Sequence, residues 1–297
     1  MRPELVFSGK SVFVAPLIIA DAPRNNRKCS NCNGESMKAG DFITDVMHSL
    51  AFLSRLPVPS RFFEDSSGVS MRRAARAFPA AGLLIALPAA FLVMIFAGFD
   101  ASPQLTGWFA IGLTALATDA LHEDGLADMA DGFGGGKDRT RMLEIMKDSR
   151  IGSYGTIAMV LSFALRATAL ASLIETLPGK TAAACLIAAL VMSRALMVWH
   201  WQALPAAKTS GIAAGAGQPG ATERNIALVI GLLLFILFTL HALPLLSIAL
   251  VLAAAVLAAV LFGRLCDRKI GGHTGDTIGA CQQITEIVIL VALALAA

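Results

Sequence analysis

Residues 78–99 read FPAAGLLIALPAAFLVMIFAGF, a run without a single charged side chain. At a helical rise of about 1.5 Å per residue, such a run is long enough to cross a hydrocarbon core of about 30 Å. Lipid offers the backbone no hydrogen-bond partner, so only helices and closed barrels span a bilayer. A run rich in Ala and Leu, without polar alternation, favours a helix over a barrel strand. The stretch therefore predicts a transmembrane helix.

The rest of the chain repeats this pattern. Hydrophobic residues make up 56% of the 297 positions, charged residues 15%, and the mean hydropathy is +0.68. Soluble domains carry about 25% charged residues. We therefore predict an all-α, polytopic membrane bundle of about seven transmembrane helices, the last of which is expected to start before its apolar run, within Gly279–Gln283. The six further runs are Leu105–Leu121, Ile151–Leu173, Thr181–Trp201, Asn225–Leu243, Pro244–Gly263 and Ile284–Ala297.

The basic residues gather on alternate connecting segments. Of the 24 Lys and Arg, eleven precede Phe78, five lie in 122–150, two in 202–224 and three in 264–273, whereas Lys180 alone lies in a segment of the opposite parity. Because Lys and Arg are enriched in cytoplasmic loops, this pattern predicts a bacterial inner-membrane protein with its N-terminus and basic segments in the cytoplasm. The basic residues thus indicate orientation and not nucleic-acid binding.

The N-terminal residues 1–40 differ from the rest in composition. They include the pair Cys29 and Cys32, but one CxxC motif is at most half of a zinc site, and a disulfide is disfavoured in the cytoplasm. We expect residues 1–40 to be a disordered or mis-assigned extension. Residues 41–297 are expected to form the transmembrane domain, beginning with an amphipathic helix that lies on the inner leaflet.

Carboxylates cluster between the second and third expected spans. Asp124, Asp128 and Asp131 are spaced i, i+4, i+7, so a helix would stack all three on one face. Such like charges repel unless a cation or protons lie between them. Oxygen ligands without His or Cys suit Mg²⁺, which binds through carboxylates and substrate phosphates. We predict a Mg²⁺ site with Glu123 and Glu144 as further candidate ligands; the alternative is a solvated loop with scattered charge.

A glycine run follows the carboxylates. Gly134, Gly135 and Gly136 leave backbone N–H groups open to phosphate oxygens, and Lys137 adds a positive charge. The spacing is not that of a Walker A loop, and a flexible hinge would also explain the glycines. Beside the carboxylates, the run favours a metal–diphosphate site.

The next segment carries interleaved acidic and basic residues. We expect a helix from Arg139 to Arg150, with Glu144 and Asp148 at i, i+4 and with Lys147 and Arg150 as partners for phosphate oxygens. The alternative is ordinary ion pairing along a surface helix.

A second motif, GGHTGDTIGACQQ at residues 271–283, precedes the last expected span. Glycines flank His273 and Asp276, which at a helix entry can hold a substrate or act as acid or base. N-capping by Thr274 or Asp276 is the alternative. Both motifs lie on the cytoplasmic side by the charge pattern, so we expect them to meet.

Two arginines lie within expected spans, where a charge is costly unless it is paired or hydrated. Arg194 lies towards the cytoplasmic end of its span, and we expect it to bond a phosphate or the acidic cluster. Arg166 lies near the outer end of its span, where snorkelling to the interface is the simpler interpretation.

Four stretches together resemble one enzyme family. They are EDGLADMADGFGGG at 123–136, MLEIMKDSRIGSYG at 142–155, RLPVP at 55–59 and GHTGD at 272–276. From about Asp41 to the C-terminus, the chain resembles the adenosylcobinamide-GDP ribazoletransferases, also called cobalamin synthases.

The resemblance implies a Mg²⁺-dependent phosphotransferase acting late in cobalamin synthesis. α-Ribazole or its 5′-phosphate would attack adenosylcobinamide-GDP, GMP would leave, and adenosylcobalamin or its phosphate would form. Asp128-x-x-Asp131-Gly132 and Glu144-x-x-x-Asp148 are also similar to parts of the CDP-alcohol phosphotransferase motif, although the Ala-Arg expected within it is absent. By that similarity Asp148 is the first candidate for the general base, followed by Asp276 and His273.

Two other classes of protein remain open at this point. A secondary transporter would also be polytopic with intramembrane arginines, but its ionisable cluster would lie near the bilayer midplane in interrupted helices. A scaffold for corrin enzymes would not require an acidic cluster. The sequence leaves homo-oligomerisation open, and the expected partners are the two substrates and the lipid bilayer.

Overall fold

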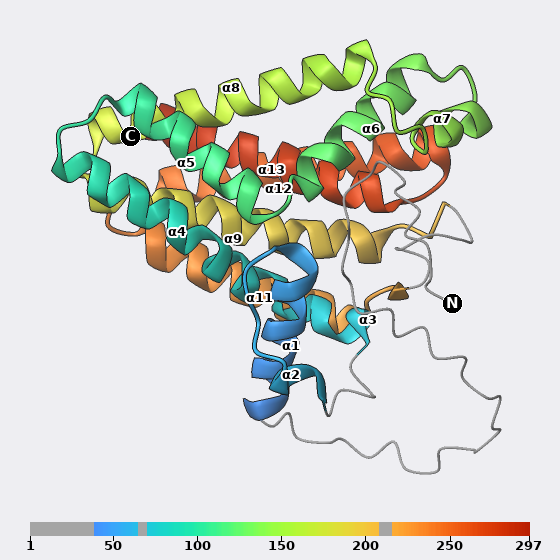
Figure 1. The fold of residues 1–297 in the computed structure, drawn as a ribbon, viewed down its shortest axis with the longest axis horizontal. Coiled ribbons are helices and arrows are strands. Elements are labelled where there is room, and N and C mark those ends of the chain that lie inside the picture. The colour runs from blue at the N-terminus through green and yellow to red at the C-terminus, as the bar shows by residue number, and fades with distance from the viewer. Residues whose placement is uncertain (1–38, 65–69, 208–215) are drawn as a thin grey trace, which may run out of the picture.

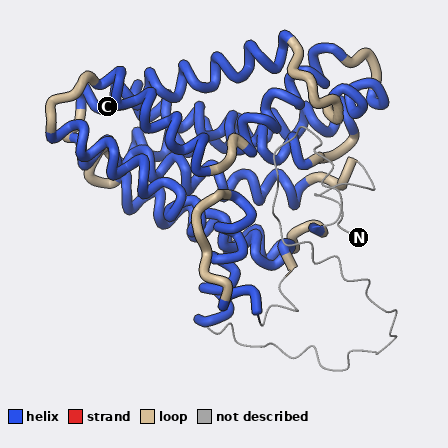
Figure 2. Tube along the Cα trace, in the orientation of Figure 1, coloured by secondary structure: helices blue, strands red, loops and turns tan. Residues whose placement is uncertain are grey.

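The computed structural model describes residues 39–64, 70–207 and 216–297. Cys29, Cys32 and nearly all of the expected extension lie outside these residues. Every named element in the described part of the chain is a helix (Figure 2). Its one isolated bridge joins Ala206 to His273. The all-α prediction is confirmed.

Six helices are long and apolar enough to cross a membrane, by length and composition. They run along the long axis of the bundle in Figure 1 and confirm a polytopic helical membrane protein. The last of them starts earlier than its apolar run, at Gly275. The six helices are α4 (Phe78–Gly98), α8 (Ser153–Thr176), α9 (Gly179–Ala203), α11 (Ala221–Thr239), α12 (Leu245–Ile270) and α13 (Gly275–Ala296).

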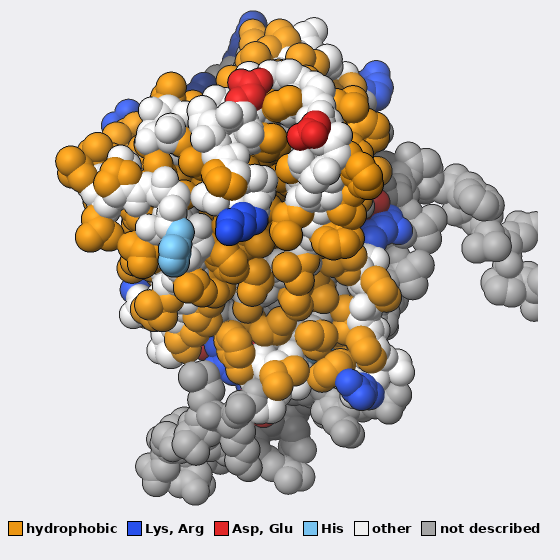
Figure 3. All heavy atoms as spheres, turned by 90° about the vertical axis from the view of Figure 1, so that its left-hand side faces the viewer, with side chains coloured by type: hydrophobic (Ala, Val, Ile, Leu, Met, Phe, Trp, Pro, Cys, Tyr) orange, Lys and Arg blue, Asp and Glu red, His pale blue; other side chains and the backbone are white. Residues whose placement is uncertain are grey.

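Helix α9 forms the centre of this bundle. Of its apolar window, 89% is buried, against 28% for α12 and 17% for α11. It packs against α4, α8, α11, α12 and α13. The outer helices instead expose large apolar side chains such as Leu233 and Leu257, and hydrophobic atoms dominate the face in Figure 3. An apolar exterior around a fully packed central helix is what a lipid environment selects.

The expected second span is shorter than predicted. Helix α5 (Pro103–Ala117) has 15 residues, because the chain turns at Asp119, whose φ is +54°. The N–H groups of Asp119 and Ala120 donate to the carbonyls of Leu116 (3.2 Å) and Ala115 (2.8 Å), which is the hydrogen-bond pattern of a Schellman motif. Because α5 ends here, the next helix, α6, can begin in a new direction.

The N-terminal segment packs on the bundle. Helix α1 (Ala39–Leu53) confirms the expected amphipathic helix and buries Leu50 and Leu53 against α4. The short helices α2 (Arg61–Glu64), α3 (Met71–Ala74) and the 3₁₀ turn η1 (Ala75–Ala77) follow it. The Ser49 hydroxyl donates to the Ala74 carbonyl at 2.8 Å, which ties α1 to the start of α4.

Helices α6 (Leu121–Gly135) and α7 (Arg139–Ile145) lie at one end of the bundle, together with the turn between α12 and α13. The C-terminus lies at the opposite end (Figure 1). The two sequence motifs therefore meet at the same end of the bundle, as expected from the charge pattern.

Candidate active site

Glycines bring the two motifs into contact where α6 crosses α13. A Cβ on Gly125 would lie 2.8 Å from the backbone oxygen of Asp276, and one on Gly279 would lie 3.4 Å from the Cα of His122. The contact at Gly279 is ordinary van der Waals contact, whereas the approach at Gly125 is possible only for a residue without a side chain. The crossing places the first turns of both helices side by side.

A second contact fixes the turn that enters α13. The His273 N–H donates to the Pro205 carbonyl, and the Ala207 N–H donates to the His273 carbonyl, both at 2.8 Å. Gly272 has a φ of +154°, and a Cβ there would lie 2.2 Å from the Pro205 oxygen. The turn is thereby fastened to the end of α9 at a position that only glycine can occupy.

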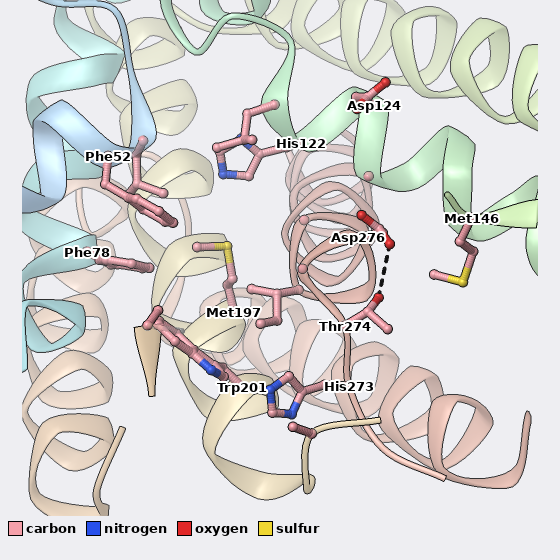
Figure 4. A pocket seen from close by; sticks show the side chains of 18 of the residues that line it. Phe52, Phe78, His122, Asp124, Met146, Met197, Trp201, His273, Thr274 and Asp276 are labelled. Atoms are coloured by element: carbon pink, nitrogen blue, oxygen red, sulfur yellow. Dashed lines mark hydrogen bonds between the residues drawn. The ribbon is translucent and has the colours of Figure 1, made fainter. Parts of the chain in front are cut away.

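A cavity of about 400 Å³ lies between these elements and α1 (Figure 4). This volume lies within the range of small-molecule sites, roughly 300–1,000 Å³. One end carries ionisable and polar groups and the other end carries aromatic rings. The residues that line the cavity include Phe52, Phe78, His122, Asp124, Met146, Lys147, Met197, Trp201, His273, Thr274 and Asp276.

The polar end joins Asp124 of α6 to Asp276 of α13. Both lie in the first turn of their helix, where the partial positive charge of the helix favours an anion. Lys147 lines the same end, and Asp124 and Lys147 are exposed. Thr274 caps α13 through a reciprocal bond pair with Thr277 and donates to Asp276 at 3.3 Å. The expected N-capping is thus real for Thr274, and it leaves Asp276 on the cavity wall.

His273 lies between the polar and the aromatic ends (Figure 4). Its Nδ1 lies 2.9 Å from the Leu204 carbonyl oxygen. A carbonyl only accepts, so Nδ1 carries the proton and Nε2 of the neutral ring keeps a lone pair. Burial lowers the pKa of His273, against the opposing effect of the Leu204 and Pro205 backbone. The ring is therefore neutral at physiological pH.

The predicted acidic face of α6 divides among several roles. The helix confirms the expected spacing, and Asp128 lies one turn beyond Asp124. The Asp131 carboxylate, however, accepts from the backbone N–H of Gly152 at 2.6 Å and of Gly155 at 2.8 Å. It therefore caps the first turn of α8.

Within the described residues, no group of three or more His, Cys, Asp and Glu side chains is placed to hold a metal ion by itself. Asp124 and Asp276 nevertheless both line the cavity. Two carboxylates that leave room for substrate oxygens are a donor set that fits Mg²⁺.

The prediction that Gly134, Gly135 and Gly136 form an open phosphate-binding loop is wrong. Gly134 and Gly135 belong to α6, and the Gly136 N–H donates to the Gly132 carbonyl at 2.9 Å. These glycines permit close packing instead, since a Cβ on Gly134 would lie 2.5 Å from the Tyr154 ring. Lys137 lines a separate open hollow with Arg141 and Glu144, away from the main cavity.

The expected helix from Arg139 to Arg150 is also shorter than predicted. Helix α7 ends at Ile145, and the Asp148 carboxylate accepts from the backbone and guanidinium of Arg150 at 2.8–3.1 Å. Such local bonding competes with helix continuation. Glu144 pairs with Arg141 at 3.1 Å on the exposed surface. Asp148 does not line the main cavity, so the structure does not place the first candidate base there.

A buried ion network lies within the bundle beneath the cavity. Arg166 donates to Glu123 at 3.0 Å and to Glu286 at 3.1 Å, and Arg194 lies 3.8 Å from Glu286. All four side chains are at most 3% exposed. Two guanidinium groups and two carboxylates make a neutral set, which reduces the penalty of burying charge. The prediction that Arg166 snorkels to the membrane interface is therefore wrong.

Two residues expected in the site, Glu123 and Arg194, belong to this buried network instead. Glu123 bonds Arg166 and, at 3.1 Å, the Gln283 amide, so it faces the bundle interior and not the cavity. Arg194 has an acidic partner, but that partner is Glu286 on α13 and not a residue of the predicted acidic cluster. Its guanidinium also donates to the Leu190 carbonyl at 3.0 Å. Neither side chain lines the main cavity.

His122 links the network to the cavity. Its ring lines the cavity, and its Nε2 is buried without a partner among the described residues. Burial, followed by the positive charges of Arg194 and Arg166, lowers the pKa of His122 well below its ordinary value. Burial and the two arginines thus keep a neutral imidazole on the cavity wall.

Sequence reasoning missed Glu286 and the aromatic end of the cavity. The sequence did offer a reason to predict an ion pair at Glu286, because an acidic residue inside an apolar span requires a partner and two arginines lie in other spans. No sequence signal marked the aromatic residues Phe52, Phe78 and Trp201, since aromatic residues are common in any membrane helix and their convergence depends on the fold.

The fold and cavity define a polytopic membrane protein with an acid-lined ligand cavity at one end of its helical bundle. The chain belongs to the cobalamin-5-phosphate synthase family, whose model matches residues 45–294. It is 51% identical over 257 residues to the adenosylcobinamide-GDP ribazoletransferase of Sinorhizobium medicae, covering 86% of this chain and 98% of that protein. It is 41% identical over 262 residues to the protein of the same name from Brucella anthropi, covering 88% and 100%. No solved structure matches the chain.

Proposed function

We propose that this chain transfers the adenosylcobinamide phosphate group from adenosylcobinamide-GDP to α-ribazole or its 5′-phosphate. A hydroxyl oxygen of the acceptor forms a new bond to the cobinamide-side phosphorus, the bond to the bridging oxygen breaks, and GMP leaves. The hydroxyl proton passes to a base. The products are adenosylcobalamin, or its phosphate, and GMP.

One observation carries this proposal beyond family membership: Asp124, Asp276 and Lys147 line one ligand-sized cavity, and the two carboxylates lie at helix N-termini. Helix N-termini and a lysine favour phosphate oxygens. Carboxylates there would repel a diphosphate unless a cation lies between them. We propose that Asp124 and Asp276, with Asp128 one turn further on, would hold Mg²⁺, which would neutralise charge on the diphosphate.

His273 is the proposed general base. Its Nε2 lone pair is free in the neutral tautomer, and the ring lines the cavity between the carboxylates and the aromatic end. Asp276 would be engaged with the cation, and Asp148 is paired with Arg150 outside the cavity. This order reverses the preference drawn from the sequence.

The charge pattern supports a cytoplasmic site in a bacterial inner membrane. Lys137, Arg139, Lys147 and Lys269 lie at the cavity end of the bundle, whereas Lys180 lies in the first turn of α9, next to the end of α8. By the positive-inside rule the cavity end faces the cytoplasm. Apolar side chains around the outer helices would contact the lipid bilayer.

A secondary transporter is not favoured. Buried charges do lie within the bundle, but Arg166, Arg194 and Glu286 lie on α8, α9 and α13, none of which is interrupted. The network is also internally neutral, and the relatives carry the name of a transferase.

The test is release of GMP by the purified protein in detergent, with adenosylcobinamide-GDP, α-ribazole and Mg²⁺. We expect turnover that EDTA stops and excess Mg²⁺ restores. Asp276→Asn should abolish it, whereas the matched control Asp100→Asn, at the exposed turn after α4, should not. Turnover in EDTA would refute the metal, and absence of GMP with intact protein and both substrates would refute the transferase.

A further inference from the structure

The aromatic end of the cavity is a distinct compartment built from three elements. Phe52 of α1, Phe78 of α4 and Trp201 of α9 line it (Figure 4). The ring centroids of Phe52 and Phe78 lie 6.1 Å apart, as do those of Phe78 and Trp201. Met197 lines the same end. Flat aromatic walls of this kind suit a flat aromatic ligand.

One polar group of this compartment lacks a partner. The indole Nε1 of Trp201 is buried and has no hydrogen-bond partner among the described residues. The Trp201 side chain is only 2% exposed. Buried indole N–H groups usually have a hydrogen-bond partner, because burying the group without a hydrogen bond is unfavourable. The compartment therefore offers aromatic surface together with a single hydrogen-bond donor.

We propose that this compartment is the acceptor-base subsite, which takes the benzimidazole ring of the α-ribazole acceptor; the inference rests on the proposed function. A benzimidazole joined to ribose is a flat fused ring whose remaining ring nitrogen has one lone pair and no proton. Trp201 Nε1–H donates to that nitrogen, while Phe52 and Phe78 contact the ring.

The other aromatic base in the reaction is the guanine of the donor. Guanine carries several donors and acceptors on its edge, and a site for it would supply several matching polar groups. The compartment supplies the Trp201 N–H among Phe, Met and Trp side chains, and the His122 ring beside Phe52 adds one more polar group, which together are fewer than the edge of guanine requires (Figure 4). Its chemistry therefore selects the benzimidazole.

The position of the compartment also suits the transfer. With the base at the aromatic end, the ribose lies near His273, and its hydroxyl is directed to the end where Asp124 and Asp276 lie. Acceptor and donor thus approach from the two ends of one cavity. Phe52, Phe78 and Trp201 set acceptor specificity and do not take part in the chemical step.

The experiment separates the acceptor from the donor. For the full chain in detergent, we would measure the KM for α-ribazole, the KM for adenosylcobinamide-GDP and kcat. Direct binding of α-ribazole without donor, by calorimetry, gives a readout that does not depend on turnover. The variants are Trp201→Phe, which keeps a ring but removes the donor, and Phe52→Leu. The matched control is Trp108→Phe, on the exposed face of α5.

We expect Trp201→Phe to raise the KM and Kd for α-ribazole about 2- to 10-fold, the usual effect of one hydrogen bond. Phe52→Leu should raise both roughly 5- to 100-fold, as loss of base stacking does. The KM for adenosylcobinamide-GDP and kcat should change less than twofold, and Trp108→Phe should change nothing.

An effect on the KM for the donor alone would assign the compartment to the donor, and equal effects on both KM values would show that it is not specific to the acceptor; either result would overturn the inference. So would wild-type values for α-ribazole in both variants. These results leave GMP release by the wild type intact and are therefore distinct from failure of the proposed function. Conversely, α-ribazole binding that depends on Trp201, without any turnover, would keep the subsite and reject the transferase.

Discussion

Glu123 and Asp124 are adjacent carboxylates on α6 with opposite environments. Glu123 is 2% exposed and bonds Arg166 and Gln283 inside the bundle. Asp124 is exposed and lines the cavity beside Asp276. Successive residues on a helix point about 100° apart, so one turn of α6 faces both the bundle interior and the cavity.

The difference separates stability from chemistry. The buried network of Glu123, Arg166, Arg194 and Glu286 balances two positive with two negative side chains without any ligand, and we expect its main role to be holding α6, α8, α9 and α13 together. The carboxylates at the cavity require a cation and a phosphate to complete them. Mutations in the two regions should therefore have different signatures in stability and in activity.

The largest effect is expected from Arg166→Met. This change leaves Glu123 and Glu286 buried without their shared partner, and loss of one member of a buried ion pair typically costs about 3–5 kcal/mol. Thermal unfolding in detergent should show a strongly lowered midpoint. The double variant Glu123→Gln/Arg166→Met should recover part of the loss, because it removes one of the two unpaired charges. Equal stability of the single variant and the wild type would mean that the network is not structural.

Asp124→Asn should affect the rate and not the fold. An exposed carboxylate contributes little to stability, but loss of a ligand to the proposed cation should reduce kcat about 10²- to 10³-fold, equivalent to about 2.7–4 kcal/mol. Glu123→Gln is the matched control on the adjacent residue and should lower the unfolding midpoint more than Asp124→Asn does. If GMP release falls equally in both variants with equal stability loss, the separation of the two regions is wrong.

The fold was largely predictable from the sequence because its determinants are local. Charge-free apolar runs define the long helices, and the Lys and Arg pattern correctly places both motifs at one end. The boundary of α5 was not predictable in the same way. Asp119 ends the helix in a left-handed conformation that glycine usually adopts, so the sequence carried no clear stop signal.

The site was predictable in its residue types but not in its geometry. Asp124, Asp276, His273 and Lys147 were all named from motifs, and they line one cavity. From the sequence, the glycines after Asp131 predict a phosphate loop, but glycine also permits close helix packing, and only the tertiary contact with Tyr154 distinguishes the two roles.

Gly125→Ala tests the crossing that brings the two regions together. A Cβ there would lie 2.8 Å from the Asp276 backbone oxygen, so α6 and α13 must separate. Overpacking of this kind typically costs about 1–3 kcal/mol. We expect a moderate loss of stability and a fall in kcat/KM, measured by thermal unfolding and GMP release. Gly98→Ala, where a Cβ meets nothing within 4 Å, is the control. A wild-type kcat/KM in Gly125→Ala would show that the approach of Asp124 to Asp276 is not needed.

The smallest effect is expected at Asp131, where the two interpretations of α6 differ most directly. The acidic spacing makes Asp131 a metal ligand, whereas the structure makes it the cap of α8 through Gly152 and Gly155. Each carboxylate oxygen accepts one backbone N–H, and an amide has a single acceptor oxygen, so Asp131→Asn should lose one of the two bonds and cost about 0.5–1.5 kcal/mol, and Asp131→Ala, which loses both, up to about 2 kcal/mol. Neither variant should alter the Mg²⁺ concentration that gives half-maximal GMP release, whereas Asp124→Asn should raise it. A cap is sensitive to loss of the acceptor oxygen but not to loss of the charge, while a Mg²⁺ ligand is sensitive to both. If Asp131→Asn raises the Mg²⁺ requirement as much as Asp124→Asn does, the carboxylate leaves its capping position when the substrates bind, and the acidic face of α6 acts as the sequence alone suggested.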